Sequence, residues 1–419
     1  MRGMWISDEK VFELAEEFGT PLYVYDEKVL RVSCGEMRGL LPNKNFRVSY
    51  SAKANGNIEI LKIVRDEDLD VDAMSPGEIY IQQEAGFASG QIFFVSNNAS
   101  ASELKYAIER DIIVSVDSLS QLELYGKLNA GGDVAIRLNP SVGLGHHSKV
   151  VTGGKLTKFG IQTAFVPEVK ALLAKYDLKL IGVNQHLGSL FMEKEPYLAG
   201  MAELLETAKQ FPGLSVIDFG GGLGVPYNEG DARLDLAGLS KAMDELLDGF
   251  LAGYENKDVM FRIEPGRYIA AECGVLLGSI NAVKTNYEKE YIGTDLGFNV
   301  LMRPVMYDSY HAMKVVSRGG AGVGAENGGA AGQRKAYTVV GNICESGDIL
   351  AKDRELAPAR EGDILLVLNA GAYGFSMSSN YNQRLRPAEV LINADGTHRL
   401  IRRRETFEDL TRTAVKTEK

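Results

Sequence analysis

The sequence has few cysteines, no long apolar run and no excess of positive charge, so it lacks features of secreted, membrane-spanning and nucleic-acid-binding proteins respectively. Its three cysteines, in 419 residues, are too few and too scattered for a disulfide framework, so a reducing cytoplasm is the expected environment. It has no apolar run of about 18 residues, and we expect no membrane-spanning helix. The first ten residues also lack the layout of a secretory signal. A formal net charge of −10 disfavours nucleic-acid binding, because such proteins are usually basic.

What remains is the composition of an ordinary globular protein. Hydrophobic residues make up 45% and charged residues 24% of the chain, which excludes a wholly disordered, collagen-like or coiled-coil protein. The length favours two or three domains, and a chain this long can bury a large core.

About the first two thirds of the chain show a regular alternation. A helix is predicted over Asp8–Phe18 with Ser7 as its N-cap, and a short strand follows at Leu22–Tyr25. Eight apolar runs then alternate with helix-like segments, which is typical of parallel βαβ units. The runs are Phe46–Ser51, Leu69–Ala73, Gln91–Val95, Ile112–Val116, Val134–Leu138, Leu180–Asn184, Ser215–Phe219 and Val259–Ile263. Eight such units predict a (β/α)8 barrel, with an open doubly wound sheet as the alternative.

From about Cys273 the alternation ends. Short apolar runs separated by turns predict a mainly β domain. The glycine-rich segment 319–332 is expected to form a flexible surface loop or a hairpin tip. The polar tail after Arg404 is expected to fray. The loop of residues 143–159 is interpreted either as a lid or as a plain loop. It contains His146-His147, which show no metal-ligand spacing, and no metal is expected.

In a (β/α)8 barrel, active sites lie at the carboxyl ends of the strands. Lys53 follows the first strand, and two uses fit it equally: a salt bridge, or a Schiff base. Asp72 lies at the end of the second strand, and His186 follows the sixth. Gly220–Gly224 follows the seventh and suits a phosphate, unless the glycines serve only tight packing. Glu264 and Arg267 follow the eighth strand. A lysine, a histidine, a glycine turn and a glutamate at one barrel mouth are what pyridoxal phosphate needs.

These residues carry a family resemblance. YSAKAN (50–55), HLGS (186–189), GGGLG (220–224) and EPGR (264–267) resemble the fold-type III pyridoxal-phosphate decarboxylases. In the β domain, RPVMYDSYH (303–311), CESGD (344–348) and GAYGFSMSSNYN (371–382) are similar to segments of the diaminopimelate decarboxylases. The likeness runs from about residue 20 to residue 402.

The resemblance implies a role for each matching residue. Lys53 is similar to the lysine that binds the cofactor, His186 to the residue stacked on its ring, and Glu264 to the partner of the ring nitrogen. Asp72 resembles a support for the lysine and ring, and Tyr373 a contact of cofactor and substrate. The phosphate contacts would be Ser189, Gly221 and Gly222. The expected substrate ligands are Arg267, Arg303, Tyr307 and Glu345, with Cys344 as a further catalytic residue. The alternative for Cys344 is a buried small hydrophobe, the commonest state of a free cysteine, and the flanking Glu345 disfavours it.

The resemblance also implies an alanine-racemase-like architecture. Residues 1–35 would join the β domain through their early strand, residues 36–272 would form the barrel that binds pyridoxal phosphate, and residues 273–419 the C-terminal β domain. Two copies would form a homodimer in which Cys344 and Glu345 reach into the partner's site.

The implied activity is decarboxylation of meso-diaminopimelate to L-lysine. Two alternatives are a related decarboxylase of D-lysine, D-ornithine or a carboxylated polyamine, and a cofactor-binding regulator without turnover. The set of Arg267, Arg303 and Glu345 disfavours the first, because charges without partners are expensive to bury. The β domain disfavours the second, because the regulators it would resemble are lone barrels.

Overall fold

The computed structural model describes residues 4–140, 144–145, 157–228, 230–318 and 334–415. The chain divides into two compact units. The first, which we call the barrel unit, comprises Leu30–Pro226 and Ala232–Ile269. The second, the β unit, comprises Met1–Val29, Tyr227–Asp231 and Ala270–Lys419. None of the described helices is both long enough and apolar enough to span a membrane.

The barrel unit holds eight parallel strands that close on themselves. They follow the order β5-β4-β3-β2-β12-β11-β9-β6, and pairing of β5 with β6 completes the circle. This closure confirms the predicted (β/α)8 barrel and excludes the open sheet. The strands are β2 (Phe46–Ser51), β3 (Asp70–Ala73), β4 (Ile92–Val95), β5 (Ile113–Val116), β6 (Asp133–Asn139), β9 (Lys179–Asn184), β11 (Val216–Asp218) and β12 (Met260–Ile263).

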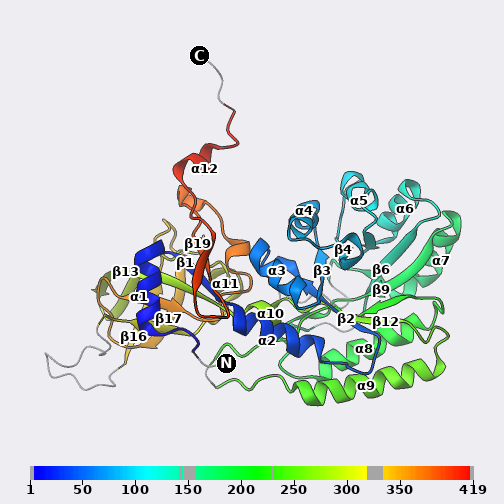
Figure 1. Cartoon of the computed structure of the whole chain (residues 1–419), viewed down its shortest axis with the longest axis horizontal. Helices are drawn as coiled ribbons and strands as arrows, with labels where there is room; N and C mark the ends of the chain where they lie inside the picture. The colour runs from blue at the N-terminus through cyan, green and yellow to red at the C-terminus, as the bar shows by residue number, and fades with distance from the viewer. Residues whose placement is uncertain (1–3, 141–143, 146–156, 229, 319–333, 416–419) are drawn as a thin grey trace. The chain divides into compact units, whose positions relative to one another are not determined.

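A helix follows each strand, and Figure 1 shows α3 to α9 around the strands. Their bounds are α3 (Ile58–Asp66), α4 (Pro76–Glu84), α5 (Ala101–Ile108), α6 (Leu119–Leu128), α7 (Val166–Lys175), α8 (Glu195–Ala208), α9 (Leu236–Gly253) and the short α10 (Arg267–Ala270). Several begin at a polar cap: the hydroxyls of Ser75, Ser100 and Ser118 each accept a backbone N–H from the first turn of the helix. Both faces of the strands are covered, which explains the consecutive apolar residues of strands such as β4.

The β unit is built on a second sheet, in which β1 (Leu22–Asp26) lies between β13 (Gly274–Asn286) and β19 (Ala388–Ile392). This confirms that the early strand joins the β domain. The other strands are β14 (Lys289–Thr294), β15 (Met313–Val316), β16 (Lys335–Val340), β17 (Ile349–Leu356), β18 (Ile364–Val367) and β20 (His398–Arg402). The core includes Leu22 and Val24 of β1 and Val390 of β19, all fully buried.

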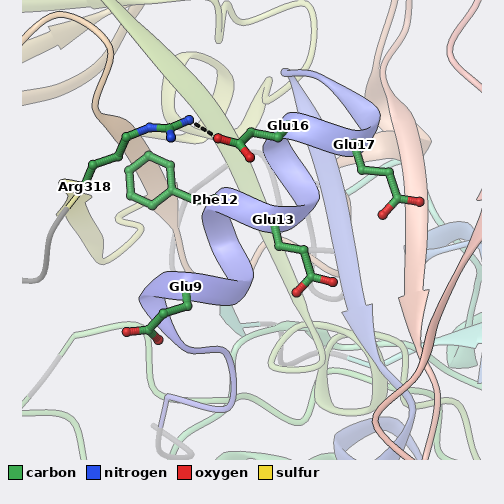
Figure 2. A pocket seen from close by; sticks show the side chains of 6 residues that line it. All are labelled: Glu9, Phe12, Glu13, Glu16, Glu17 and Arg318. Atoms are coloured by element: carbon green, nitrogen blue, oxygen red, sulfur yellow. Dashed lines mark hydrogen bonds and ion pairs between the residues drawn. The ribbon is translucent and has the colours of Figure 1, made fainter.

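Helix α1 (Asp8–Phe18) packs on this sheet through its buried Val11 and Leu14, and it begins at the predicted cap, Ser7. Its outer face is acidic. Glu9, Glu13, Glu16 and Glu17 line a surface pocket with Phe12 and Arg318, and Arg318 pairs with Glu16 (Figure 2). These carboxylates are mostly exposed, as expected of a solvated helix face.

One local expectation needs correction and others lie outside the description. The tail after Arg404 forms a short helix, α12 (Phe407–Thr411), because Thr406 and Asp409 make a capping box at its start. The predicted glycine-rich loop 319–332, His146-His147 and most of the loop 143–159 lie outside the described residues.

Candidate active site

In the barrel unit, Lys53 and Asp72 lie at the ends of neighbouring strands. Lys53 is in the 3-10 turn Ala52–Ala54 directly after β2, and β2 pairs with β3, where Asp72 is completely buried. The Asp72 carboxylate accepts the Ser51 hydroxyl at 2.7 Å and the Ala52 N–H at 3.2 Å. Burial raises the pKa of Asp72, and the Lys53 charge opposes that rise. Asp72 therefore anchors the turn that carries the lysine.

His186 is held as a neutral imidazole. Its Nδ1 accepts the backbone N–H of Gly221 at 3.1 Å, so the ring proton is on Nε2. Desolvation, together with the positive charges of Lys53 and Arg137, lowers the pKa of His186 well below its ordinary value. The ring is thus fixed in orientation and uncharged at neutral pH.

Glu264 lies among other buried carboxyl groups. It is 4% exposed, and among the residues that the structure describes its Oε1 has no hydrogen-bond partner. Burial raises the pKa of Glu264 well above its ordinary value, and the nearby Asp218 and Asp72 raise it further. A buried acceptor in this state is stabilised by a cationic N–H donor, since such a donor supplies both the missing hydrogen bond and the missing charge.

The glycine turn after β11 has no room for side chains. A Cβ on Gly221 would lie 2.0 Å from the carbonyl oxygen of Glu264, and one on Gly222, where φ is +111°, would lie 2.6 Å from the Phe191 ring. The N–H of Gly220 donates to Asp218, that of Gly221 to His186 and that of Gly224 to the Phe191 carbonyl. Three of the five backbone N–H groups of the turn therefore already donate to other groups of the barrel unit. Of the two glycines expected to contact phosphate, Gly221 is one of these three donors, so the expected contact falls to the N–H of Gly222.

Ser189 and Arg267 are in contact. The Ser189 hydroxyl accepts from Nε of Arg267 at 3.2 Å and from Nη2 at 2.9 Å. Arg267 is 6% exposed. The guanidinium predicted to bind substrate and the hydroxyl predicted to bind phosphate are thus immediate neighbours, and both groups suit an anion.

The barrel residues fit pyridoxal phosphate. An orphaned buried acceptor on Glu264 matches a protonated ring nitrogen, a neutral oriented imidazole on His186 can lie against an aromatic ring, and the hydroxyl of Ser189 can bind phosphate. Lys53, in the turn after β2, carries a primary amine, the group that this cofactor's aldehyde requires.

The β unit places Arg303 and Tyr307 at opposite ends of α11 (Arg303–Tyr307). Arg303 is 2% exposed, and its guanidinium lies 4.7 Å from the ring centre of Tyr227. Its Nη1 is 2.8 Å from Nε2 of His311. A buried guanidinium held in this way is preorganised to bind a carboxylate through its planar donors.

Cys344 and Glu345 lie on one loop after β16. The N–H of Cys344 donates to the Asn382 side chain at 2.8 Å, and Glu345 accepts the Tyr381 hydroxyl at 2.5 Å. Both Cys344 and Glu345 are exposed. The disfavoured alternative, a buried hydrophobe at Cys344, is therefore excluded, because the turn that follows β16 leaves the residue at the surface. Tyr373 adopts φ of +58° in the segment after β18.

The sequence reasoning missed several ionisable residues of the barrel unit, among them Arg137, Asp117, Asp218 and Glu78. Arg137, at the end of β6, is 7% exposed and its charge interacts with both Glu264 and Asp117. Asp218 ends β11, where burial raises its pKa to about 6. Burial also raises the pKa of Glu78, on α4, to about 7. For Arg137 and Asp218 the signal was present, since each is a charged residue within a predicted apolar run, the same feature that marked Asp72.

Comparisons with known proteins agree with this geometry. A family model described as "Pyridoxal-dependent decarboxylase, pyridoxal binding domain" matches residues 29–271. The chain is 39% identical to a diaminopimelate decarboxylase of Methanothermobacter thermautotrophicus, over 96% of this chain and 92% of that protein. It is 34% identical to the Escherichia coli K12 enzyme of the same name, over 97% and 96%.

Solved structures show the same likeness. A diaminopimelate decarboxylase from M. jannaschii in complex with L-lysine superposes with a TM-score of 0.86 at 31% identity, covering 97% of this chain and 94% of that one. The Helicobacter pylori enzyme complexed with L-lysine also gives 0.86, at 29% identity over 96% and 98%. With its closed barrel, its buried cofactor-type site and its full-length relatives, the chain belongs to the diaminopimelate decarboxylase family of pyridoxal-dependent decarboxylases.

Proposed function

We propose that this chain uses pyridoxal phosphate to decarboxylate meso-2,6-diaminopimelate to L-lysine and CO2, the last step of lysine biosynthesis. The observation that carries the proposal is the similarity to diaminopimelate decarboxylases over 96% of the chain. We assign cofactor binding to the barrel, residues 36–272, and part of the substrate recognition to the β domain, residues 273–419.

The cofactor, when bound, supplies a ring that accepts the electron pair released as CO2 leaves. Lys53 holds it through Nζ, and Asp72 keeps the turn of Lys53 in place through Ser51 and Ala52. His186 presents a neutral ring face. Glu264 keeps the ring nitrogen protonated, because a carboxylate favours the charged form of a neighbouring cation. Ser189 and Gly222 bind the phosphate.

Substrate recognition falls to charged groups. Diaminopimelate has an amino-acid group at each end, and the end that does not react must be held through its carboxylate and ammonium. Arg267, Arg303 and Tyr307 bind that carboxylate, and Glu345 binds the ammonium, while Tyr373 contacts both cofactor and substrate. Opposite charges brought together away from water give strong discrimination against ligands that lack either group.

We further propose a cytoplasmic homodimer with shared sites. The exposed Cys344 and Glu345 lie on one loop. In the dimer this loop would insert into the active site of the partner subunit, which would bury both residues. Cys344 would act catalytically in that site. The small number of cysteines supports a reducing compartment.

Two measurements test the function. Purified protein with added cofactor is given meso-diaminopimelate, D-lysine, D-ornithine or a carboxylated polyamine, and CO2 release is measured for each. Release from diaminopimelate supports the proposal, and release from another substrate alone contradicts it. In parallel, Lys53→Ala should lose the absorbance of the lysine-bound cofactor, while Lys62→Ala on α3, whose ammonium pairs with Glu59 at 2.8 Å, should keep it.

A further inference from the structure

Arg303 is fixed by a histidine for which no role has yet been given. His311 lies between α11 and β15 and is 1% exposed. Its Nδ1 is 2.9 Å from the carbonyl oxygen of Leu368, and its Nε2 is 2.8 Å from Nη1 of Arg303. The histidine thus joins the substrate-binding arginine to the segment after β18.

The partners determine the state of the imidazole. A carbonyl oxygen can only accept, so Nδ1 carries the proton and donates to Leu368. A guanidinium can only donate, so Nε2 is unprotonated and accepts from Arg303. His311 is therefore neutral in this arrangement, with Nδ1 as a hydrogen-bond donor and Nε2 as an acceptor.

Further contacts hold the pair. The Tyr227 ring lies under the Arg303 guanidinium, and it also packs on the His311 ring with centroids 5.4 Å apart and planes at 85°. Arg354 donates to the carbonyl oxygen of His311 at 2.7 Å. Since an arginine side chain has many rotamers, such contacts select one of them before any ligand arrives.

We propose that His311 is a positioning residue: through Nε2 it aims Arg303 at the carboxylate of the end that does not react, and thereby sets the preference for ligands that carry this carboxylate. The inference rests on the proposed function, because it takes Arg303 as the ligand of that carboxylate. His311 itself need not touch substrate or cofactor.

Two amide substitutions separate this role from a merely structural one. In His311→Gln the side-chain amide reaches about as far as Nε2 and can again accept from Arg303. In His311→Asn the shorter amide reaches about as far as Nδ1, so it can donate to Leu368 but cannot reach Arg303. His311→Phe keeps a ring on Tyr227 and removes both hydrogen bonds. His398→Gln, at a histidine that bonds Glu17 of α1, is the control.

The readout is binding of two ligands that differ by one group. L-lysine, the product, keeps the carboxylate of the end that does not react, whereas 1,5-diaminopentane has the same chain without it. Dissociation constants are measured on the cofactor-loaded enzyme from the change in cofactor absorbance, and thermal unfolding checks that each variant is folded. Arg303→Ala shows how much discrimination is lost when the guanidinium of Arg303 is itself removed.

We expect His311→Asn and His311→Phe to weaken L-lysine about tenfold, roughly 1.4 kcal/mol, and to change 1,5-diaminopentane less than about twofold. His311→Gln should keep most of the lysine affinity, and His398→Gln all of it. Equal weakening of both ligands, equal behaviour of the Gln and Asn variants, or unchanged discrimination in Arg303→Ala would overturn the positioning role. Failure of the proposed function is recognised separately, as a wild-type enzyme that releases no CO2 from diaminopimelate.

Discussion

The backbone N–H of Glu264 donates to the carbonyl oxygen of Gly220 at 3.0 Å. The N–H of Gly220 in turn donates to the Asp218 carboxylate at 2.8 Å. Gly220 therefore links β11 to the residue after β12 through its own N–H and its own carbonyl oxygen. The glutamate assigned to the ring nitrogen and the turn assigned to the phosphate are thus parts of one rigid element, which suits a cofactor held at both ends.

The charge of Glu264 should matter more for turnover than for cofactor binding. Glu264→Gln keeps the size of the side chain but removes the carboxylate that we propose keeps the ring nitrogen of the cofactor protonated. We expect kcat to fall by roughly 10²-fold, about 2.7 kcal/mol of barrier, while the cofactor stays bound by absorbance. Glu255→Gln, at an exposed position after α9, is the control. A variant of Glu264 with unaltered kcat would remove this residue from the mechanism.

The glycine turn should tolerate no side chain at Gly222. In Gly222→Ala the new Cβ would meet the Phe191 ring at 2.6 Å and the Gly188 carbonyl oxygen at 2.7 Å, at φ of +111°. The turn must then shift, and we expect cofactor affinity, measured by titration, to fall at least tenfold. At Gly213 a Cβ meets nothing within 4 Å, so Gly213→Ala should bind the cofactor normally. Equal affinities in the two variants would show that the turn does not bind the cofactor.

Glu78 should make stability depend on pH. Burial raises the pKa of this carboxyl from 4.5 to about 7, so between these values the folded protein holds a proton that the unfolded chain has lost. Its contribution to stability therefore falls as pH rises from about 4.5 to 7, and the full penalty applies above 7.

Glu78→Gln removes this term and keeps an acceptor for the Met74 N–H, which Glu78 binds at 2.6 Å. The free energy of unfolding should therefore drop less between pH 5 and pH 8 than in the wild type, by at most about 3 kcal/mol. Glu84→Gln, at an exposed position of the same helix, should match the wild type. If Glu78→Gln matched it too, the Glu78 carboxyl would titrate normally.

Shared sites predict complementation between inactive subunits. In a hybrid dimer of Lys53→Ala and Glu345→Ala, one site carries both lesions and the other carries neither. Random reassortment makes about half of the dimers hybrid, so roughly a quarter of wild-type activity should return. If Glu345 served its own subunit, every site would carry one lesion. No recovery, with hybrids confirmed by differently tagged subunits, would therefore exclude shared sites.

The strands could be predicted because the barrel buries them on both faces. Phe46–Ser51 was predicted with the bounds of β2, and all eight runs became barrel strands. Asp72 and Glu264 were recognised because they lie at the ends of these runs. A charged group beside a buried strand destabilises the fold unless it is paired, so such a residue indicates a functional site. Motif resemblance supplied the residues of the β unit, where no periodicity singles out an arginine such as Arg303.

What the sequence could not reveal depends on contacts between distant segments. Leu368 is 57 residues from His311, and only the folded sheet brings its carbonyl to the ring. The engagement of the Gly221 amide by His186 is likewise a contact over 35 residues. Local patterns carry no record of such pairs, and the pKa shifts that follow from burial share this dependence on the folded chain.

The central claim is tested most directly by the products of one reaction. The purified enzyme, saturated with pyridoxal phosphate, is incubated with meso-diaminopimelate, and CO2 and the configuration of the lysine formed are measured together. The account predicts one L-lysine for each CO2, with no D-lysine, because Arg303 and Glu345 hold the end that does not react. The account is contradicted if no CO2 is released from diaminopimelate while D-lysine, D-ornithine or a carboxylated polyamine is decarboxylated.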